Sequence, residues 1–314
     1  MATRLHLRPH AARPPAPLSD AARAYDTVAA TYFDHAEGKD SGLFAFGGAH
    51  GFTDRALWAR LDAMLVRLWT EGRRAIRILD AGCGPGTWLL RLAVRARDLG
   101  FTAIEGRGVD CAPAMIGLAR SRRRLALDPH IGLRFDVGDL LDALDEEEEG
   151  SFDIVLCLNG VLNHLTADQR ARAAAAMERV CDGEVFVTGY SVGGNPSLYL
   201  ADAFDVRQFR QDNERDRLEI HLADGRCLQL PSHLFTAEEL AGLFSCRVER
   251  LELAGLDLFH ARFHDNPRYN PKGLDHHRRD DELDRLERLC ETMPALIDSA
   301  SQILFHGRCP AGAG

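Results

Sequence analysis

Lysine is almost missing from this chain of 314 residues. Lys39 and Lys272 are the only lysines among 38 basic residues, and arginine supplies the rest along the whole length. Arginines gathered in one place would suggest bidentate binding of an anion, but arginines spread everywhere do not. We interpret the bias as the coding preference of a GC-rich genome.

Long apolar runs and paired cysteine motifs are missing as well. Residues 1–18 lack the apolar run of a secretory signal, and no later stretch has the length of a membrane span. The eight cysteines include no C-x-x-C pair, which favours reduced thiols. We therefore expect a cytoplasmic protein without a membrane partner. The formal net charge of −9 argues against nucleic acid as the main partner, because proteins that bind it usually carry a basic field.

What the sequence does contain is an alternation of strand and helix patterns, with an apolar fraction of 46%. Repeated strand–helix units predict an α/β fold with a doubly wound, mostly parallel sheet. The expected strands are residues 76–79, 105–110, 131–137, 152–158, 184–190, 247–254 and 302–306. The expected helices are residues 19–32, a segment through Leu57 and Leu68, a segment from Thr87, residues 112–126, 166–180 and 198–209, and a segment capped by Thr236.

Breaks in this alternation suggest how the chain is divided. The sheet should be interrupted by an inserted hairpin whose turn is Asp224-Gly225 and whose strands wall a substrate pocket. The expected parts are a tail at 1–18, an N-terminal helical cap at 19–72, a cofactor-binding core at 73–192, an inserted helix and hairpin at 193–234, and the end of the core at 235–314 with an excursion at 255–301.

The segment from Ile76 to Thr87 predicts a nucleotide site. A short buried strand runs into a glycine-rich turn, and a helical pattern starts at Thr87, which we expect to cap that helix. A dinucleotide fingerprint would need glycine in place of Thr87, and a P-loop would need a lysine. The acidic Asp80 would repel a pyrophosphate but would suit an ammonium or sulfonium group. These features indicate S-adenosylmethionine.

Four segments in order resemble the motifs of the class I S-adenosylmethionine-dependent methyltransferases. They are residues 79–86, 108–116, 137–140 and 152–160. The resemblance implies a Rossmann-like fold in which the last strand runs antiparallel to its neighbours. It also implies S-adenosylmethionine as the cofactor and S-adenosylhomocysteine as the product. Residues 25–32 resemble the N-terminal helix that many small-molecule methyltransferases place over the cofactor.

Asp110 is the candidate for the ribose hydroxyls, since an acidic side chain after the second strand can accept both hydrogen bonds of a diol. The alternative is an N-cap of the helix that opens at Pro113, and the two roles are compatible. The resemblance implies that Asp139 receives the adenine amino group, with Leu140 and Met115 beside the ring. The full set of expected cofactor-binding residues is Tyr32, Asp80, Ala81, Gly82, Gly84, Asp110, Cys111, Met115, Asp139, Leu140, Asn159 and Gly160.

Two residues are candidates for catalysis. His164 follows the fourth strand at the mouth of the site and titrates in a useful range, so it could be a general base, or else a histidine that packs under the next helix. Tyr190 ends the fifth strand and could orient the substrate. His260 and His264 are spaced for one helix face, but a third ligand is not identifiable, so we expect no metal.

The expected function is transfer of a methyl group to an oxygen or nitrogen, with carbon also open, of a small molecule in bacterial secondary metabolism. A nucleic-acid methyltransferase fits less well, because Asn159-Gly160 stands where adenine-directed members carry Asn/Asp-Pro-Pro. A different class remains open: a protein of this fold that binds the cofactor without methylating, either a cyclase-like catalyst or a silent binding subunit. The expected partner is the small-molecule acceptor, and a homodimer is the default oligomer.

Overall fold

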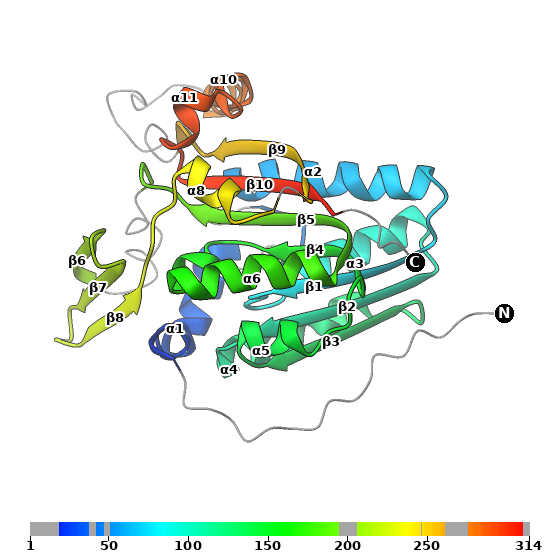
Figure 1. The fold of residues 1–314 in the computed structure, drawn as a ribbon, viewed down its shortest axis with the longest axis horizontal. Coiled ribbons are helices and arrows are strands. Elements are labelled where there is room, and N and C mark those ends of the chain that lie inside the picture. Colours follow the sequence, from blue (N-terminus) through cyan, green and yellow to red (C-terminus); the bar gives the residue numbers. More distant parts are fainter. Residues whose placement is uncertain are drawn as a thin grey trace.

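A seven-stranded sheet forms the centre of the molecule in the computed structural model, which describes residues 19–37, 42–46, 51–194, 206–245, 247–260 and 276–309. The strand order is β3-β2-β1-β4-β5-β10-β9 (Figure 1). The strands are β1 (Ala75–Ala81), β2 (Ala103–Asp110), β3 (Ile131–Val137), β4 (Phe152–Cys157), β5 (Cys181–Tyr190), β9 (Glu249–Leu256) and β10 (Gln302–Arg308).

The sheet is parallel except at one strand. β2, β1, β4 and β5 pair in parallel, whereas β10 runs antiparallel to both β5 and β9. This confirms the predicted mostly parallel, doubly wound sheet and its reversed last strand. The order changes direction between β1 and β4, and open α/β sheets bind ligands at the carboxyl ends of the strands beside such a switch point.

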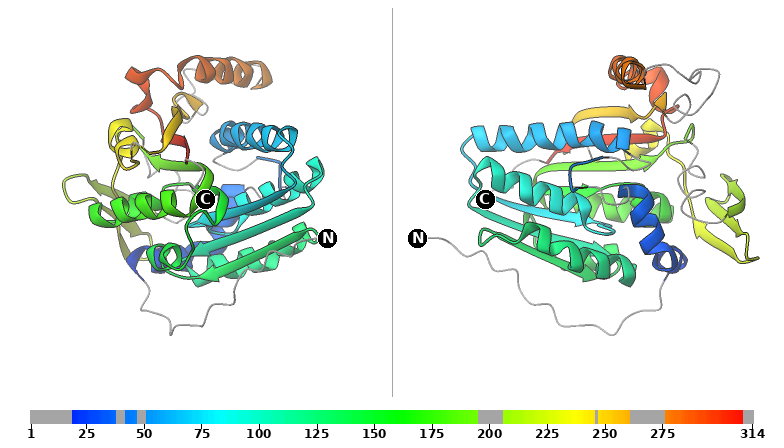
Figure 2. Two further views of the ribbon diagram at one scale, coloured as in Figure 1. Left: turned by 45° about the vertical axis from the view of Figure 1, so that its right-hand side comes forward. Right: turned by 180° about the vertical axis from the view of Figure 1, so that it is seen from behind.

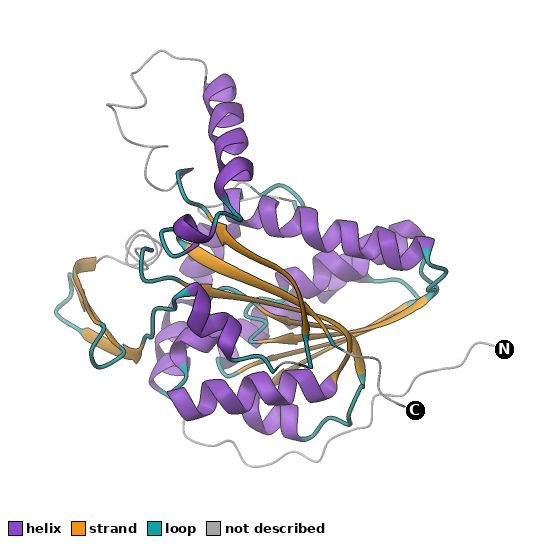
Figure 3. Ribbon diagram, turned by 45° about the horizontal axis from the view of Figure 1, so that its top comes forward, coloured by secondary structure: helices purple, strands orange, loops and turns teal. Residues whose placement is uncertain are grey.

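Helices cover both faces of the sheet (Figures 2 and 3). One face packs against α2 (Gly51–Thr70), α3 (Thr87–Leu99) and α4 (Pro113–Arg122), and the other packs against α5 (Leu140–Asp145), α6 (Ala167–Val180) and α8 (Ala237–Gly242). Because successive side chains of a strand point to opposite faces, Ile76 and Ile78 of β1 join the first core, and Leu79 and Ala81 join the second. Both faces are therefore buried, which explains the continuous apolar strands of the sequence.

A separate three-stranded sheet follows β5. It consists of β6 (Val206–Asp212), β7 (Arg217–Leu222) and β8 (Cys227–Pro231), and it projects from the carboxyl edge of the main sheet (Figure 1). The turn at Asp224-Gly225 confirms the predicted hairpin, with Gly225 at a φ of 89°. The prediction of a helix over 198–209 was wrong for Val206–Phe209, because these residues pair with β7, a partner that the local pattern does not reveal. Residues 198–205 lie outside the described part.

The remaining helices frame the sheet. α1 (Asp20–Glu37) lies against α4 and β8, and α10 (His276–Cys290) and α11 (Pro294–Ile297) belong to the excursion before β10. The predicted cap at Thr236 is present, and Thr166 and Thr236 each form a capping box at the start of their helix. None of the helices in the described ranges combines the length and the apolar character that a bilayer crossing requires.

The predicted cap at Thr87 was wrong. Gly86, at a φ of 76°, is the N-cap of α3 and has no side chain that could form a cap hydrogen bond. Thr87 is buried in the first turn, where its Oγ1 accepts a hydrogen bond of 2.6 Å from Arg122.

Candidate active site

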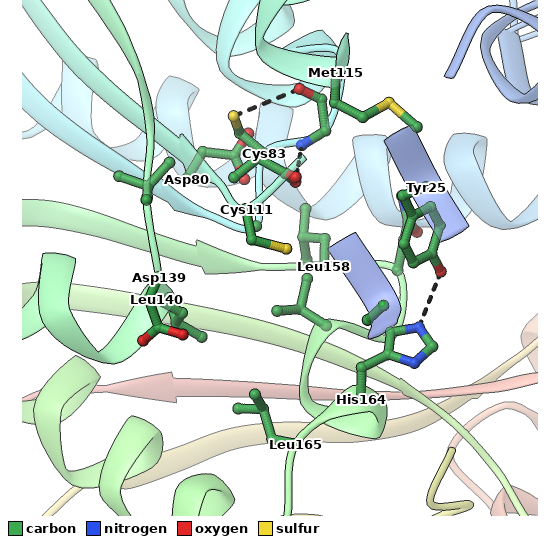
Figure 4. A pocket seen from close by; sticks show the side chains of 18 of the residues that line it. Tyr25, Asp80, Cys83, Cys111, Met115, Asp139, Leu140, Leu158, His164 and Leu165 are labelled. Atoms are coloured by element: carbon green, nitrogen blue, oxygen red, sulfur yellow. Dashed lines mark hydrogen bonds between the residues drawn. The ribbon is translucent and has the colours of Figure 1, made fainter. Parts of the chain in front are cut away.

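A cavity of about 280 Å³ lies at the carboxyl ends of β1, β2 and β4. Its walls are the glycine turn after β1, the residues after β2 and β3, and the segment after β4 (Figure 4). α1 and the end of β8 add Tyr25 and Pro231. Of the residues predicted to bind the cofactor, those that line the cavity are Asp80, Gly82, Gly84, Asp110, Cys111, Met115, Asp139, Leu140 and Asn159.

Backbone hydrogen bonds to β2 fix the conformation of the glycine turn that follows β1. The amides of Gly82 and Cys83 both donate to the Val109 carbonyl, at 2.8 and 2.9 Å. Gly82 has a φ of 83°, and a Cβ there would lie 2.3 Å from the Val161 side chain. No other residue type therefore fits this position without moving the segment after β4.

Asp110 ties the glycine turn to the start of α4. Its Oδ2 accepts from the Gly84 amide and its Oδ1 accepts from the Ala112 amide, both at 2.9 Å. Ala112, not Asp110, is the N-cap of α4, so the capping alternative was wrong in detail. Each carboxylate oxygen can accept a second hydrogen bond, so the side chain fits a ribose diol while it holds the turn.

Asp80 is a buried carboxylate, and one of its two oxygens lacks a hydrogen-bond partner among the described residues. Its side chain is only 1% exposed, and among the described residues Oδ2 has no hydrogen-bond partner. Burial, with a smaller contribution from Asp110, raises the pKa of Asp80 to about 7. An orphaned acidic oxygen on the cavity wall fits a positively charged group, such as the ammonium or sulfonium of S-adenosylmethionine.

The expected adenine end combines one acid with apolar walls. Asp139 caps α5 through Oδ1, which accepts from the Leu141 and Asp142 amides at 2.8 and 3.3 Å. Met115 and Leu140 are buried on the cavity wall. The carboxylate is exposed and has acceptor capacity left, so the helix-capping role and the predicted contact with an amino group are compatible.

His164 lies across the cavity from Asp139 and forms a pair with Tyr25 (Figure 4). It ends a short 3₁₀ helix, Val161–His164, and Nδ1 lies 2.7 Å from the Pro231 carbonyl oxygen. Nε2 lies 2.9 Å from the Tyr25 hydroxyl, and the two rings meet edge to face. Burial lowers the pKa of His164 and raises that of Tyr25 far above its usual value.

Among the cavity residues that sequence reasoning missed are Tyr25 and Asp54. Tyr25 contacts His164 from 139 positions away, and the only signal was the resemblance of residues 25–32 to a cofactor-covering helix. Asp54 also lines the cavity and lies 3.2 Å from Arg91. The buried guanidinium of Arg91 lies over the rings of Phe46 and Trp88. Its ion pair with Asp54 therefore holds the Asp54 carboxylate in position.

Three predicted site residues do not line the cavity: Ala81, Gly160 and Tyr190. The backbone of Tyr190 is held by the Asn163 side chain, and a Cβ on Gly160 would lie 2.4 Å from the Tyr190 ring. Burial, with a smaller effect of Asp54, raises the pKa of Tyr190 to about 12. Gly160 and the Tyr190 ring thus contact each other outside the set of residues that line the cavity. The side chain of Tyr32 lies outside the described part.

Of the two histidines considered as metal ligands, His260 lies in the described part of the chain and His264 lies outside it. His260 stacks on Phe52 with ring centroids 4.0 Å apart, and its Nε2 lies 2.8 Å from Asp284. The described residues contain no group of three or more His, Cys, Asp or Glu that could hold a metal ion.

Comparisons with known proteins agree with these motifs. Residues 78–183 match the family model described as a methyltransferase domain. No curated protein sequence matches the chain.

Solved structures similar to this chain include two methyltransferases crystallised with S-adenosylhomocysteine. The magnesium protoporphyrin IX methyltransferase of Synechocystis is 12% identical, with 93% of this chain and 100% of that chain covered and a TM-score of 0.49. The N-methyltransferase NodS of Bradyrhizobium japonicum is 15% identical, with the same coverages and a TM-score of 0.48. A methyltransferase of Methanosarcina mazei is 18% identical over 76% of this chain and 94% of that chain, with a TM-score of 0.45.

Such identities are too low to transfer a substrate. The family identification depends instead on the ordered motifs, the matched domain and the sheet order that this chain itself displays. Asp80 and Asp110 both line the cavity beside the glycine turn. The chain therefore contains a methyltransferase domain at residues 78–183, built on a Rossmann-like sheet.

Proposed function

We propose that this methyltransferase acts on an oxygen or nitrogen atom of a small molecule. The observation that carries the proposal is the Tyr25–His164 pair, which lies in the same cavity as Asp80 and Asp110 but on the side away from Asp139. A base beside the expected methyl-transfer position is what an acceptor with a proton to lose requires.

The cover over this side of the cavity supports a small acceptor. α1 contributes Tyr25 and β8 contributes Pro231, and the two elements contact each other. His164 bridges them, because its two ring nitrogens contact one residue from each. A polymer would need an open groove along the surface, whereas a small molecule can be enclosed.

Each residue then has a defined task. When bound, S-adenosylmethionine supplies a methyl group on a positively charged sulfur. Asp110 binds the ribose hydroxyls and Asp80 provides negative charge near the cationic end. His164 is neutral at physiological pH because its pKa is lowered, so it can take a proton from the acceptor.

Labelled cofactor provides the test. Purified protein is incubated with methyl-labelled S-adenosylmethionine and a small-molecule extract, and labelled products are identified by mass spectrometry. The matched control is Asp110→Ala, which should weaken cofactor binding by about 1–3 kcal/mol because buried donors lose their acceptor. A labelled small molecule that depends on Asp110 supports the proposal. Transfer of label only to protein or nucleic acid contradicts the proposal. A complete lack of transferred label contradicts it as well.

A further inference from the structure

A second cavity, of about 380 Å³, lies beside β3, the outermost of the described strands on that side of the main sheet. α4 and β3 contact each other at the lower edge of the sheet in Figure 1, and a short 3₁₀ helix at Arg123–Ala126 follows α4. These three elements supply the lining residues, which are Arg120, Arg123, Arg134, Phe135 and Asp136. None of the five lines the cofactor cavity, so the second cavity is separate from the candidate active site.

Two of these arginines are held by the backbone of β3. An edge strand leaves the carbonyl groups of its outer side without a strand partner. Arg120 donates through Nε and Nη2 to the Phe135 carbonyl, at 3.0 and 2.8 Å, and Arg123 donates through Nη1 to the Leu133 carbonyl at 3.3 Å. Leu133 and Phe135 belong to the buried core of the sheet, so the two carbonyl groups are themselves fixed.

The anchored guanidinium groups keep hydrogens for a ligand. A guanidinium has five N–H donors. The contacts to the strand use two donors of Arg120 and one of Arg123. Both residues are exposed, so a ligand can reach the remaining donors from solvent. Because the side chains are already tethered, less conformational entropy is lost when a ligand binds.

The charges around this cavity do not cancel. Asp136 is the acid among the lining residues, and its Oδ2 lies 2.7 Å from Arg134 and 3.2 Å from the buried Arg107. Its charge is thus shared by two other guanidinium groups. Within the described part of the chain, Arg120 and Arg123 form no ion pair with an acidic side chain. They are two uncompensated cations on a protein whose formal net charge is −9.

A phosphate group fits this arrangement in charge and in shape. A phosphate monoester carries about −1.5 to −2 charges at pH 7 and has three free oxygens. Arginine binds phosphate through two parallel hydrogen bonds, so two guanidinium groups that approach from different elements can each take their own pair of oxygens. A carboxylate has one charge and two oxygens, and it can satisfy only one of the two groups in this way.

We propose that the cavity at Arg120 and Arg123 binds a phosphate group, carried by a monoester or present as the free anion. The site lies outside the cofactor cavity, and the inference does not depend on the proposed methyl transfer.

Inorganic phosphate tests the site directly. It is titrated into the full-length protein at pH ~7.5 and a constant ionic strength of about 0.15 M, while the backbone amide signals are followed by NMR. S-adenosylhomocysteine is present, because the amides of the glycine turn are a rival place for an anion. The inference expects saturation below about 20 mM, with the shifts concentrated in residues 120–136. A lack of saturation, or shifts centred on residues 82–86, would overturn it.

Two neighbouring arginines separate a built site from a general effect of charge. Arg123→Gln removes a guanidinium from the cavity and should weaken phosphate binding by about 10-fold or more. Arg124→Gln removes the same charge from an exposed neighbour that does not line the cavity, and it should change the affinity by less than about 2-fold. Equal losses in the two variants would show a general electrostatic effect and overturn the inference.

Arg120→Gln provides an independent measurement. This variant also takes a partner from the Phe135 carbonyl, so a melting curve is recorded for each variant to verify that it is folded. In the folded protein, Arg120→Gln should weaken phosphate binding as much as Arg123→Gln does. Unchanged affinity in a folded Arg120→Gln protein would contradict the site.

Two phosphate esters identify the form of the ligand. Glycerol 3-phosphate keeps the double charge. If it binds at least as tightly as inorganic phosphate, the site takes a phosphorylated molecule, and if it binds more weakly, the site takes the free anion. Dimethyl phosphate has one charge and two free oxygens, so it should bind about 10-fold more weakly than inorganic phosphate. Equal affinity for dimethyl phosphate would contradict the match of two charges and overturn the inference.

Discussion

Asp80 and Asp110 lie at the carboxyl ends of the neighbouring parallel strands β1 and β2, and both line one cavity. The negative charge of Asp110 adds to the burial that raises the pKa of Asp80 to about 7. Asp110 is compensated by two backbone amides, whereas Oδ2 of Asp80 has no hydrogen-bond partner among the described residues. Asp80 is thus the acid that responds to an arriving positive charge.

Cofactor affinity should therefore depend on pH through Asp80. A cationic ligand favours the ionised carboxylate, so binding should release protons near pH 7 and the affinity should rise between about pH 6 and 8. Calorimetry in buffers of different ionisation enthalpy measures this release. Asp80→Asn should bind more weakly and with a flat pH dependence. An unchanged pH dependence in Asp80→Asn would show that another group titrates.

The same residue should make the ligand-free protein less stable as the pH rises. The folded chain holds a proton on Asp80 up to about pH 7, and the unfolded chain loses it near pH 4. The free energy of unfolding should fall across this window, by at most about 4 kcal/mol. Asp80→Asn should remove this part of the fall and raise the melting temperature at pH ~8. Parallel stability curves for the two proteins would contradict this account.

The three-stranded insertion should serve the acceptor side and not the cofactor. Leu218, Ile220 and Leu230 form a small apolar cluster within the insertion, apart from the two cores of the main sheet. Replacing Asn213–Gln229 with a short glycine bridge should leave cofactor binding intact and abolish turnover, since the chain that positions Pro231 over His164 is lost. Binding and turnover are measured on the same preparation. Loss of cofactor binding would show that the insertion belongs to the cofactor-binding core.

Much of the fold was predictable because the buried strands repeat a local pattern. Ile76 and Ile78 alternate with Leu79 and Ala81 on two buried faces, and a capping box such as Thr166 with Gln169 is readable from four residues. The motif acids were predictable for a similar reason, since they follow strand ends at fixed places.

The wrong predictions of secondary structure share a different cause. In each, the element depends on a residue distant in sequence or on a backbone conformation. Val206–Phe209 is a strand because β7 pairs with it. The short helix α5 was missed beside the acidic run at 146–149, although Asp139 caps it. Thr87 does not cap α3 because Gly86 adopts a left-handed conformation that the sequence does not display.

The candidate site divides in the same way. Asp80, Asp110 and Asp139 belong to contiguous motifs and line the cavity as a set. Tyr25 and Asp54 reach the cavity from the two N-terminal helices, and only the folded arrangement reveals them. Tyr190 was proposed from its place at a strand end, but its ring packs on Gly160 behind the cavity wall.

The most direct test of the account is the pH dependence of a single turnover with the true acceptor, measured for the wild type and His164→Gln. His164 acts as a base only when neutral, and burial lowers its pKa below the usual value of 6.5. The wild-type rate should therefore rise as the pH increases through an ionisation below about 6.5 and then level off. His164→Gln keeps a side chain that can hydrogen-bond Tyr25 but cannot take a proton. This variant should bind the cofactor normally, lose about 10²–10⁴-fold in rate and lack that ionisation. Equal rates and matching pH profiles in the two proteins would contradict the assignment of His164 as the base.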